Sequence, residues 1–398
     1  MGAVIDGTAL DEVLRAAAES GAVPHVAAIA ADRDGVIYEG AAGPRAAGES
    51  DPVTADTLFR LMSMTKMPCT VAALQLVEQG RLDLNAPVAE YCPELAALQV
   101  LTGFDGDTPR LRPPATRATV ANLLTHTSGL GYWFWSDRLT RWEQVTGVPQ
   151  GARSSVTFTA PMLADPGAVF TYGVSTDWLG RVVEAVSGAG LDVAIREGIT
   201  GPLGMTQTTF VMSDEQRLRS SPVHIRRGGH WVAVGETPSR APAHFSGGGG
   251  LYGTPRDYIR FERALLRGGE LDGTRILAPS TVDAAFANQI GALDFPSDIP
   301  TADPRSSCRF TAGPGHKWGY GLLLNTADVP GMRRAWSGGW AGLCNTQFWV
   351  DRAAGVCASI YGSFLPFVTP EAVALRNDFE RALYAAATGA GPAARPGR

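Results

Sequence analysis

The chain carries the hexapeptide LMSMTK at residues 61–66, and this stretch decides the fold that we expect. Ser63 and Lys66 stand three residues apart at the start of a mostly apolar run, which predicts a buried helix over 64–79 ended by Gly80. That spacing puts both side chains on one helix face, within reach of each other. A serine hydroxyl needs a base to become a nucleophile, and a lysine in apolar surroundings can lose its proton and serve as one. The helix N-terminus would also offer backbone N–H groups to an oxyanion.

The scarcity of lysine gives this spacing more weight. The chain has two lysines, Lys66 and Lys317, against 32 arginines. Codon bias explains most of this imbalance. A lysine that stands where arginine is the rule still points to a role in proton transfer, because an ammonium can lose its proton and a guanidinium cannot. The alternative from this motif alone is a surface helix start with Ser63 as the N-cap.

Length and composition set the outer limits. The chain has 398 residues, of which 45% are hydrophobic and 18% charged, so it can bury a large core. The net charge of −5 argues against a nucleic-acid-binding protein. No apolar run approaches the roughly 18 residues that a membrane span needs. The start of the chain is acidic and lacks a basic segment, and the five cysteines are scattered, so we expect a cytoplasmic protein with reduced thiols.

The pattern along the chain is strand-forming at both ends and helical in the middle. We expect a helix over 8–20, then a strand pair at 26–31 and 36–41, and later strands at 319–325, 346–350 and 355–360 before a helix over 370–386. Segments 95–114, 131–165 and 288–316 read as loops or irregular chain. The expected fold is α/β (α+β), with an antiparallel sheet flanked by terminal helices. Its sheet domain is discontinuous (1–65 and 311–388), a mainly helical domain covers 66–310, and the tail 389–398 is expected to be disordered.

Two further segments have residue types that suit acyl transfer. Tyr172, in FTYGVSTDWLG at 170–180, precedes a helix expected over 177–187, and a tyrosine there could act as a base beside an ammonium. The second segment, AWSGGW at 335–340, contains glycines that would let a substrate approach the backbone, where a free N–H could complete an oxyanion hole. A packing tyrosine and a tight turn between strands are the simpler explanations.

Other common sites are absent from the sequence. It contains no GxGxxG after a strand, no Walker A sequence, no HExxH and no GxSxG, and its six histidines lack metal-ligand spacing. No metal and no organic cofactor are therefore implied.

Non-catalytic stretches accompany the three segments: GRLDL at 80–84 with Pro87, LLTHTSGL at 123–130, Pro166-Gly167, and GGGGL at 247–251 with Asp257. Together and in this order they resemble the serine β-lactamase-like superfamily, which includes class C β-lactamases, penicillin-binding DD-peptidases and family VIII carboxylesterases. The resemblance spans residues 8–385, and Ser-Met-Thr-Lys is the form common in the esterases. It implies a β-lactamase/transpeptidase-like fold.

The resemblance also implies a mechanism. Ser63 would attack an ester carbonyl, Tyr172 with Lys66 would relay the proton to the leaving alcohol, and the N–H groups of Ser63 and Gly339 would hold the oxyanion. Water activated by Tyr172 would then release the acyl group. His126 would belong to a structural helix end, and Cys69 would be a packed thiol.

Departures from the β-lactamase pattern favour esters as substrates. Val174 replaces the asparagine of Tyr-x-Asn, and Ser175 is the one polar substitute nearby. Trp336 replaces the lysine of Lys-Thr-Gly, and an indole N–H cannot replace the full charge that binds a carboxylate. The segment instead resembles the Trp-x-Gly pattern of the esterases. The residues expected to line the substrate pocket are Tyr132, Trp133, Ser175, Trp336, Ser337, Gly338 and Trp340.

Four functions therefore stay open. The first is a carboxylesterase for small or short-chain esters. The second is an acyltransferase on the same fold that passes the acyl group to an alcohol. A β-lactamase or D-amino-acid amidase is weakened by Val174 and Trp336, and a catalytically dead binding protein is disfavoured by the presence of Ser63, Lys66 and Tyr172. We expect a small-molecule ester as partner, with no nucleic acid and no membrane; the sequence leaves the oligomeric state open.

Overall fold

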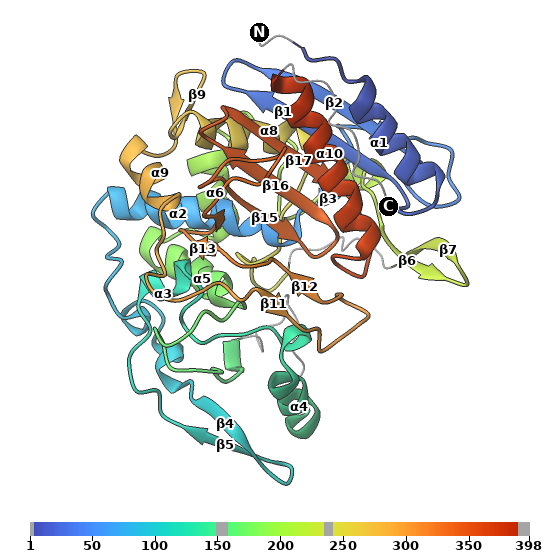
Figure 1. Cartoon of the computed structure of the whole chain (residues 1–398). Coiled ribbons are helices and arrows are strands. Elements are labelled where there is room, and N and C mark those ends of the chain that lie inside the picture. The colour runs from blue at the N-terminus through green and yellow to red at the C-terminus, as the bar shows by residue number, and fades with distance from the viewer. Residues whose placement is uncertain (1–3, 149–157, 235–241, 389–398) are drawn as a thin grey trace.

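Both ends of the chain contribute to one seven-stranded antiparallel sheet in a computed structural model, which describes residues 4–148, 158–234 and 242–388 (Figure 1). The strand order is β13-β14-β15-β16-β17-β1-β2, so that β1 lies beside β17. The strands are β1 (Val26–Asp32), β2 (Val36–Ala42), β13 (His316–Trp318), β14 (Leu323–Asn325), β15 (Gly338–Gly342), β16 (Thr346–Asp351) and β17 (Val356–Tyr361). All seven fall within 1–65 and 311–388, and the predicted mixed α/β class with an antiparallel sheet is confirmed.

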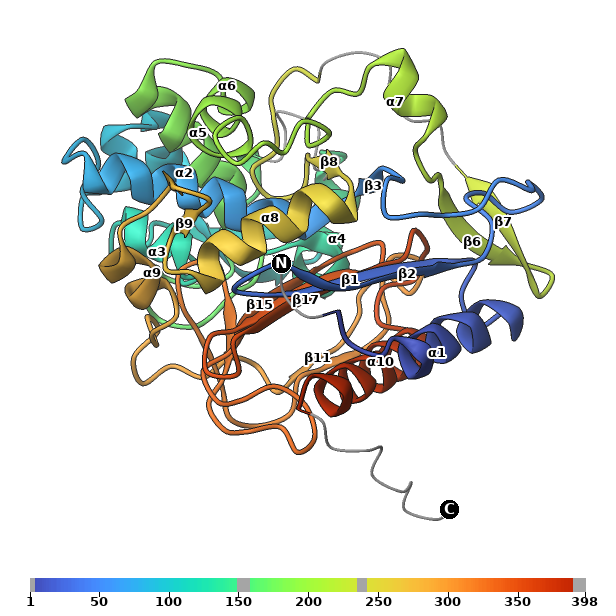
Figure 2. The same ribbon diagram turned by 90° about the horizontal axis from the view of Figure 1, so that it is seen from above.

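Helices cover both faces of this sheet. The terminal helices α1 (Thr8–Glu19) and α10 (Pro370–Thr388) pack on one face, and α8 (Pro255–Leu266) lies on the other (Figure 2). Strand β1 is therefore apolar up to its last residue, Asp32. Ala28 and Ala30 join the core under the terminal helices, while Ala27 and Ile29 join the core under α8. Although α8 lies in the segment predicted to form the inserted domain, it belongs to the layer on the sheet.

The helical part of the molecule is built around α2 (Lys66–Glu78). Nearly every residue of α2 is buried, and it packs against α5 (Ser175–Ser187) and α6 (Leu191–Ile195). The other helices are α3 (Val120–Leu124), α4 (Asp137–Thr146), α7 (Asp214–Leu218) and α9 (Pro279–Ala285), with short turns η1 (Met62–Thr65), η2 (Val88–Glu90), η3 (Pro93–Ala97), η4 (Trp133–Trp135) and η6 (Arg196–Thr200). Two-stranded pairs complete the described chain: β3 (Phe59–Arg60) with β8 (Tyr252–Gly253), β4 (Val100–Asp105) with β5 (Thr108–Arg112), β6 (Val223–Arg227) with β7 (His230–Val234), β9 (Glu270–Leu271) with β10 (Thr274–Arg275), and β11 (Asp298–Ile299) with β12 (Phe310–Thr311).

Three expectations about local structure were wrong. The segment 95–114 is not a loop, because β4 and β5 pair as a hairpin that extends away from the body of the molecule (Figure 1). The segment 131–165 contains α4, which Ser136 caps at its start and Gly147, in the left-handed conformation, ends. The expected strand 319–325 is interrupted by Gly321 at a φ of 75°, which separates β13 from β14. The tail 389–398 lies outside the described residues.

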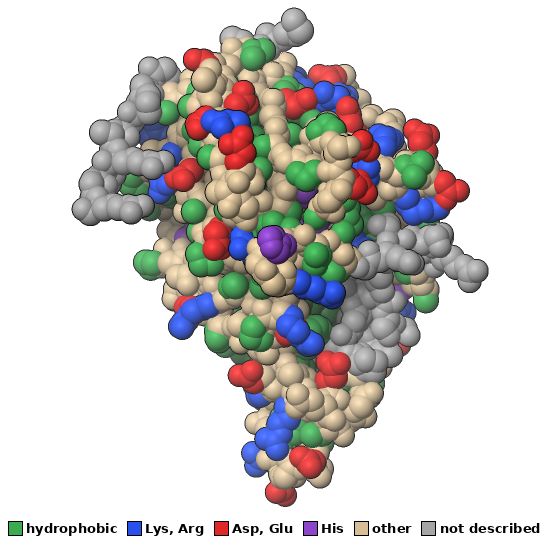
Figure 3. Space-filling model, turned by 90° about the vertical axis from the view of Figure 1, so that its right-hand side faces the viewer, with side chains coloured by type: hydrophobic (Ala, Val, Ile, Leu, Met, Phe, Trp, Pro, Cys, Tyr) green, Lys and Arg blue, Asp and Glu red, His purple; other side chains and the backbone are tan. Residues whose placement is uncertain are grey.

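The described chain contains no helix with the length and apolar character needed to cross a membrane. On the face shown in Figure 3, acidic and basic side chains are intermingled, and neither sign forms a continuous patch there. This face therefore lacks the basic stripe typical of proteins that bind nucleic acids.

Candidate active site

The turn that carries Ser63 is held against the sheet. Leu61 donates its N–H to the Leu251 carbonyl at 3.0 Å, and Thr346 Oγ1 donates to the Leu61 carbonyl at 3.2 Å. A Cβ on Gly342 of β15 would lie 2.4 Å from that same carbonyl, so glycine is required for this close approach. Met62 has a φ of 48°, which is unusual for a residue with a side chain and marks local strain beside Ser63.

The side chain of Lys66 is buried next to Ser63, and its Nζ atom has three oxygen atoms around it. The side chain is 1% exposed, and Nζ donates to Ser63 Oγ at 3.1 Å, Tyr132 Oη at 3.0 Å and the Gly248 carbonyl at 2.7 Å. These partners are a hydroxyl, a phenol and a backbone carbonyl, so none of the three is a carboxylate that would form an ion pair with Lys66. The geometry suits a lysine that takes a proton from Ser63.

A proline near the start of α2 leaves the helix intact. Pro68 lies in its first turn, where a missing N–H costs little. Since Pro68 cannot donate to the Met64 carbonyl, Tyr258 Oη does so instead, at 2.9 Å. This bond ties the Ser63 turn to helix α8.

Tyr172 lies three residues before the start of α5, with its ring against the Lys66 side chain. Lys66 Nζ is 4.9 Å from the centre of that ring, and Trp340 Nε1 donates to Tyr172 Oη at 2.7 Å. Because Trp340 donates a hydrogen bond to this oxygen, the O–H of Tyr172 can itself donate to another acceptor. The hydrogen bonds of the described residues do not include one from Tyr172 Oη to Ser63 or Lys66, so its place in the proton relay stays a prediction.

His126 supports the Tyr172 loop from behind. It is buried, its carbonyl accepts from Thr171 N at 2.7 Å, and its ring lies 4.7 Å from the Tyr172 ring. Burial, and secondarily the nearby charge of Lys66, hold the pKa of His126 well below its ordinary value. These contacts fit the structural role that the sequence suggested.

Strand β15 brings the third segment to the site, since it packs against η1. Gly339 pairs with Leu323 and Trp349 of the neighbouring strands, and a Cβ there would lie 2.4 Å from the Phe348 carbonyl. Its role as an oxyanion donor stays a prediction. Trp336, just before the strand, is 46% exposed at a φ of 63°.

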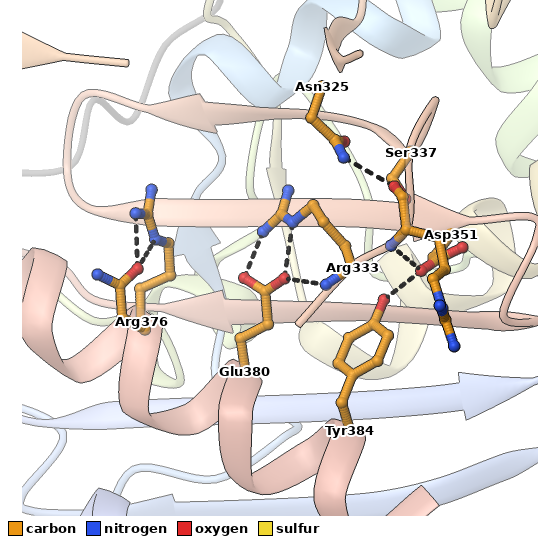
Figure 4. A network of polar contacts seen from close by, with 9 residues as sticks. Asn325, Arg333, Ser337, Asp351, Arg376, Glu380 and Tyr384 are labelled. Atoms are coloured by element: carbon orange, nitrogen blue, oxygen red, sulfur yellow. Dashed lines mark hydrogen bonds and ion pairs between the residues drawn. The ribbon is translucent and has the colours of Figure 1, made fainter. Parts of the chain in front are cut away.

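A buried network holds the loop that leads into β15 (Figure 4). Arg333 makes a two-pronged ion pair with Glu380 of α10, at 2.7 and 2.6 Å. Asp351 Oδ2 accepts from Arg334 N at 2.7 Å and from Tyr384 Oη at 2.8 Å. Helix α10, on the far face of the sheet, thereby fixes a loop that ends at the active site.

Several predicted pocket residues are used in other contacts. Ser337 Oγ donates to the Arg334 carbonyl at 2.7 Å, and buried Ser175 shares a 2.8 Å hydrogen bond with Ser128. A Cβ on Gly338 would contact the Phe286 ring, so this glycine faces the core. Trp133 lies in η4, where its ring contacts Phe134.

Aromatic rings do surround Tyr172. Those of Tyr132, Trp135, Trp318 and Trp340 lie with their centres between 4.9 and 6.3 Å from its own. The four consecutive aromatic residues at 132–135 had indicated in the sequence that aromatic side chains lie at the site. The contacts of Lys66 with Gly248 and Tyr132 had no comparable signal, because they join segments distant in the sequence.

The comparisons with known proteins give the family and the fold of the chain. The family model described as Beta-lactamase matches residues 10–383. The chain belongs to the beta-lactamase family. Its fold is therefore the β-lactamase/transpeptidase-like one that the sequence predicted.

Two relatives in the beta-lactamase family are enzymes of acyl transfer or ester cleavage. Lovastatin esterase of Penicillium rubens is 34% identical over 366 residues, which cover 87% of this chain and 90% of the relative. Monacolin J acid methylbutanoyltransferase of Aspergillus terreus is 29% identical over 427 residues, covering 97% and 99%. The solved structure of a simvastatin synthase mutant from Aspergillus terreus superposes with a TM-score of 0.83 at 28% identity, covering 96% of this chain and 97% of that one. The chain is thus a serine hydrolase or acyl-transfer enzyme of the beta-lactamase family.

Proposed function

We propose that the chain is a serine carboxylesterase for small, uncharged esters that works through an acyl-enzyme on Ser63. The observation that carries the proposal is the 3.1 Å contact between Lys66 Nζ and Ser63 Oγ inside a buried, aromatic site.

The proposed reaction has two halves. Lys66 accepts the Ser63 proton while Oγ attacks the ester carbonyl, with the N–H groups of Ser63 and Gly339 as the oxyanion donors. The tetrahedral intermediate then collapses, and the leaving alkoxide takes a proton from Tyr172, which Lys66 replenishes. Water next attacks the acyl-enzyme, giving its proton to Tyr172 as Tyr172 passes its own proton to Lys66. The acid then leaves as Ser63 Oγ takes that proton back from Lys66.

The preference for an uncharged ester rests on Trp336, the exposed residue just before β15. Trp336 stands where β-lactamases carry a lysine, and Lys317 cannot substitute for it, since its Nζ donates to the Leu293 carbonyl at 2.7 Å and pairs with Asp294. A substrate carboxylate would therefore lack this cation.

Transfer to an alcohol is the second candidate. It is supported by the near full-length match to the methylbutanoyltransferase and by the aromatic rings around Tyr172, which would disfavour water.

The test is pre-steady-state hydrolysis of p-nitrophenyl acetate and butyrate, with and without added alcohol, and nitrocefin in parallel. We expect a burst of p-nitrophenol followed by turnover, abolished in Ser63→Ala and retained in Ser20→Ala, a change at the exposed end of α1. Faster release with alcohol, together with a new alkyl ester, would favour the transferase. Nitrocefin turnover without an ester burst would contradict both.

A further inference from the structure

A buried carboxylate lies beside the site without a part in the reaction above. Asp177, in the first turn of α5, is 2% exposed. Its Oδ1 accepts from Ser246 Oγ at 2.5 Å and from Gly248 N at 3.1 Å. Its Oδ2 is buried and has no hydrogen-bond partner among the described residues. A buried carboxylate oxygen without a donor is rare enough to indicate a function.

This oxygen faces the tyrosine that contacts Lys66. A Cβ on Gly248 would lie 2.4 Å from Asp177 Oδ2 and 2.9 Å from Tyr132 Oη, so the two oxygens flank one point. One water molecule between them could accept from Tyr132 and donate to Asp177. Burial, and then the Asp177 charge, raise the pKa of Tyr132 well above its ordinary value, so this phenol keeps its proton and needs an acceptor for it.

Whether Lys66 can act as a base depends on which acceptor the O–H of Tyr132 donates to. A neutral amine has two N–H groups and one lone pair, and the Gly248 carbonyl can only accept, so it takes one N–H. If Tyr132 donates to the lone pair, Ser63 finds no base. If Tyr132 donates elsewhere, Lys66 donates to Tyr132 Oη and its lone pair accepts from Ser63.

We propose that Asp177 is a positioning residue that directs the lone pair of Lys66 to Ser63. Through a bridging water molecule its Oδ2 takes the hydrogen bond of the Tyr132 phenol. Its Oδ1 fixes Gly248, whose carbonyl accepts one N–H of Lys66. When Ser63 reacts, its O–H bond breaks and a third N–H bond forms on Lys66. The ammonium then has the three acceptors seen around Nζ. This inference rests on the proposed Ser63 acyl-enzyme.

The contacts of two neighbouring groups lead away from Tyr132. The Cys69 thiol donates to the Thr176 carbonyl at 3.6 Å, and the His244 ring packs against Phe158. Burial raises the pKa of the Cys69 thiol and lowers that of His244. The titratable and charged groups around Asp177 and Tyr132 are Lys66 and Cys69 of α2, Tyr172, His244, and Arg181 and Glu184 of α5.

The test is the rate at which a fluorophosphonate labels Ser63, followed by intact mass between pH 5 and pH 10. Labelling needs an activated serine but no ester turnover. Asp177→Asn keeps an oxygen for Ser246 and Gly248. Its amide N–H, however, donates to the bridging water molecule, which can then donate to Tyr132 Oη and turn the phenol toward Lys66. We expect labelling at pH 7 to slow by about 50- to 100-fold, and the acid limb of the profile to move about one pH unit lower as the negative charge is lost. Glu184→Gln, the matched change on α5, should stay within threefold of the wild type.

A double-mutant cycle separates positioning from a general effect on the fold. Tyr132→Phe should slow labelling by less than tenfold, and adding Asp177→Asn to it should change the rate by less than threefold, because the competing phenol is gone. Wild-type labelling rates in Asp177→Asn, or equal losses in both backgrounds, would overturn the proposal. If Asp177→Asn fails to fold, a loss of 1000-fold or more in Tyr132→Phe would overturn it instead. A wild-type protein whose Ser63 is not labelled would refute the proposed function itself.

Discussion

The two lysines of the chain have opposite surroundings. Lys66 is buried against Ser63, whereas Lys317 forms a partly exposed ion pair with Asp294. We expect Lys66→Ala to lower kcat/KM for p-nitrophenyl butyrate by about 10³-fold or more, because Ser63 loses its base. Lys317→Ala should stay within about twofold, since exposed ion pairs contribute little. Equal losses in both variants would contradict Lys66 as the base.

A second buried acid has consequences for stability. Glu262 of α8 is fully buried, and burial raises its pKa well above the ordinary value. It is therefore protonated in the folded state over a pH range in which the unfolded state has already released its proton. The free energy of unfolding should then fall by about 1.4 kcal/mol per pH unit from this group as pH rises above its unfolded pKa.

Urea unfolding at pH 5, 7 and 9 checks this. Glu262→Gln should gain stability over the wild type as pH rises, and Glu270→Gln, at a partly exposed glutamate, should not. If the free energy of unfolding has the same pH dependence in Glu262→Gln as in the wild type, Glu262 does not release a proton on unfolding and the prediction is wrong.

At the scale of elements, the link from α10 to β15 joins the sheet's far face to the active site. Glu380 is fully buried; although burial would raise its pKa, Arg333 keeps it below the ordinary value. Glu380→Gln leaves Arg333 without its counter-charge and should cost about 3 kcal/mol of unfolding free energy. It should also lower kcat/KM, because the loop before Gly338 and Gly339 loses its anchor.

Asp378→Asn is the matched control for this prediction. Asp378 lies on the same helix in an exposed pair with Arg381, so its loss should cost less than about 0.5 kcal/mol. Urea unfolding and ester kinetics on both variants measure the two effects. Unchanged kinetics in Glu380→Gln would show that the loop keeps its position without the ion pair.

The sequence predicted elements better where apolar patterns are continuous. The helix beginning near Ser63 and the strands at 346–350 and 355–360 were found because their residues are buried. The hairpin β4–β5 was missed because its exposed strand carries Arg110 and Arg112, which give no apolar alternation. At the site, the motifs located Ser63 and Lys66, but the contacts of Lys66 with Gly248 and Tyr132 depend on the tertiary fold.

At the scale of the whole molecule, two buried histidines make the fold sensitive to acid. The rings of His25 and His224 lie 5.1 Å apart where β1 meets the β6–β7 segment. Ala47 N donates to His224 Nε2 at 3.0 Å, which requires the neutral ring. Burial, and then the charge of His224, lower the pKa of His25 to about 3, and burial lowers that of His224. The stability from these neutral rings is complete above the ordinary histidine pKa near 6.5 and is lost as pH falls from there toward 3.

Thermal unfolding between pH 7 and pH 4 tests this expectation. His25→Gln should flatten the decline of Tm with falling pH, even if it lowers Tm at pH 7. His230→Gln, at an exposed position of β7, should leave the slope unchanged. A slope in His25→Gln equal to that of the wild type would assign the acid sensitivity to other groups.

The pairing of β1 with β17 also constrains the order in which the protein can be made. Ala27 lies opposite Tyr361, so a ribosome must synthesise more than three hundred intervening residues before the first strand meets its neighbour. Until then β1 and β2 form an isolated hairpin, which is at best marginally stable in water. Strand β15 has been made by then, but its anchor on α10 arrives later still. The growing chain therefore contains Ser63 long before Ser63 can react, because catalysis must wait until β17 and α10 have been made.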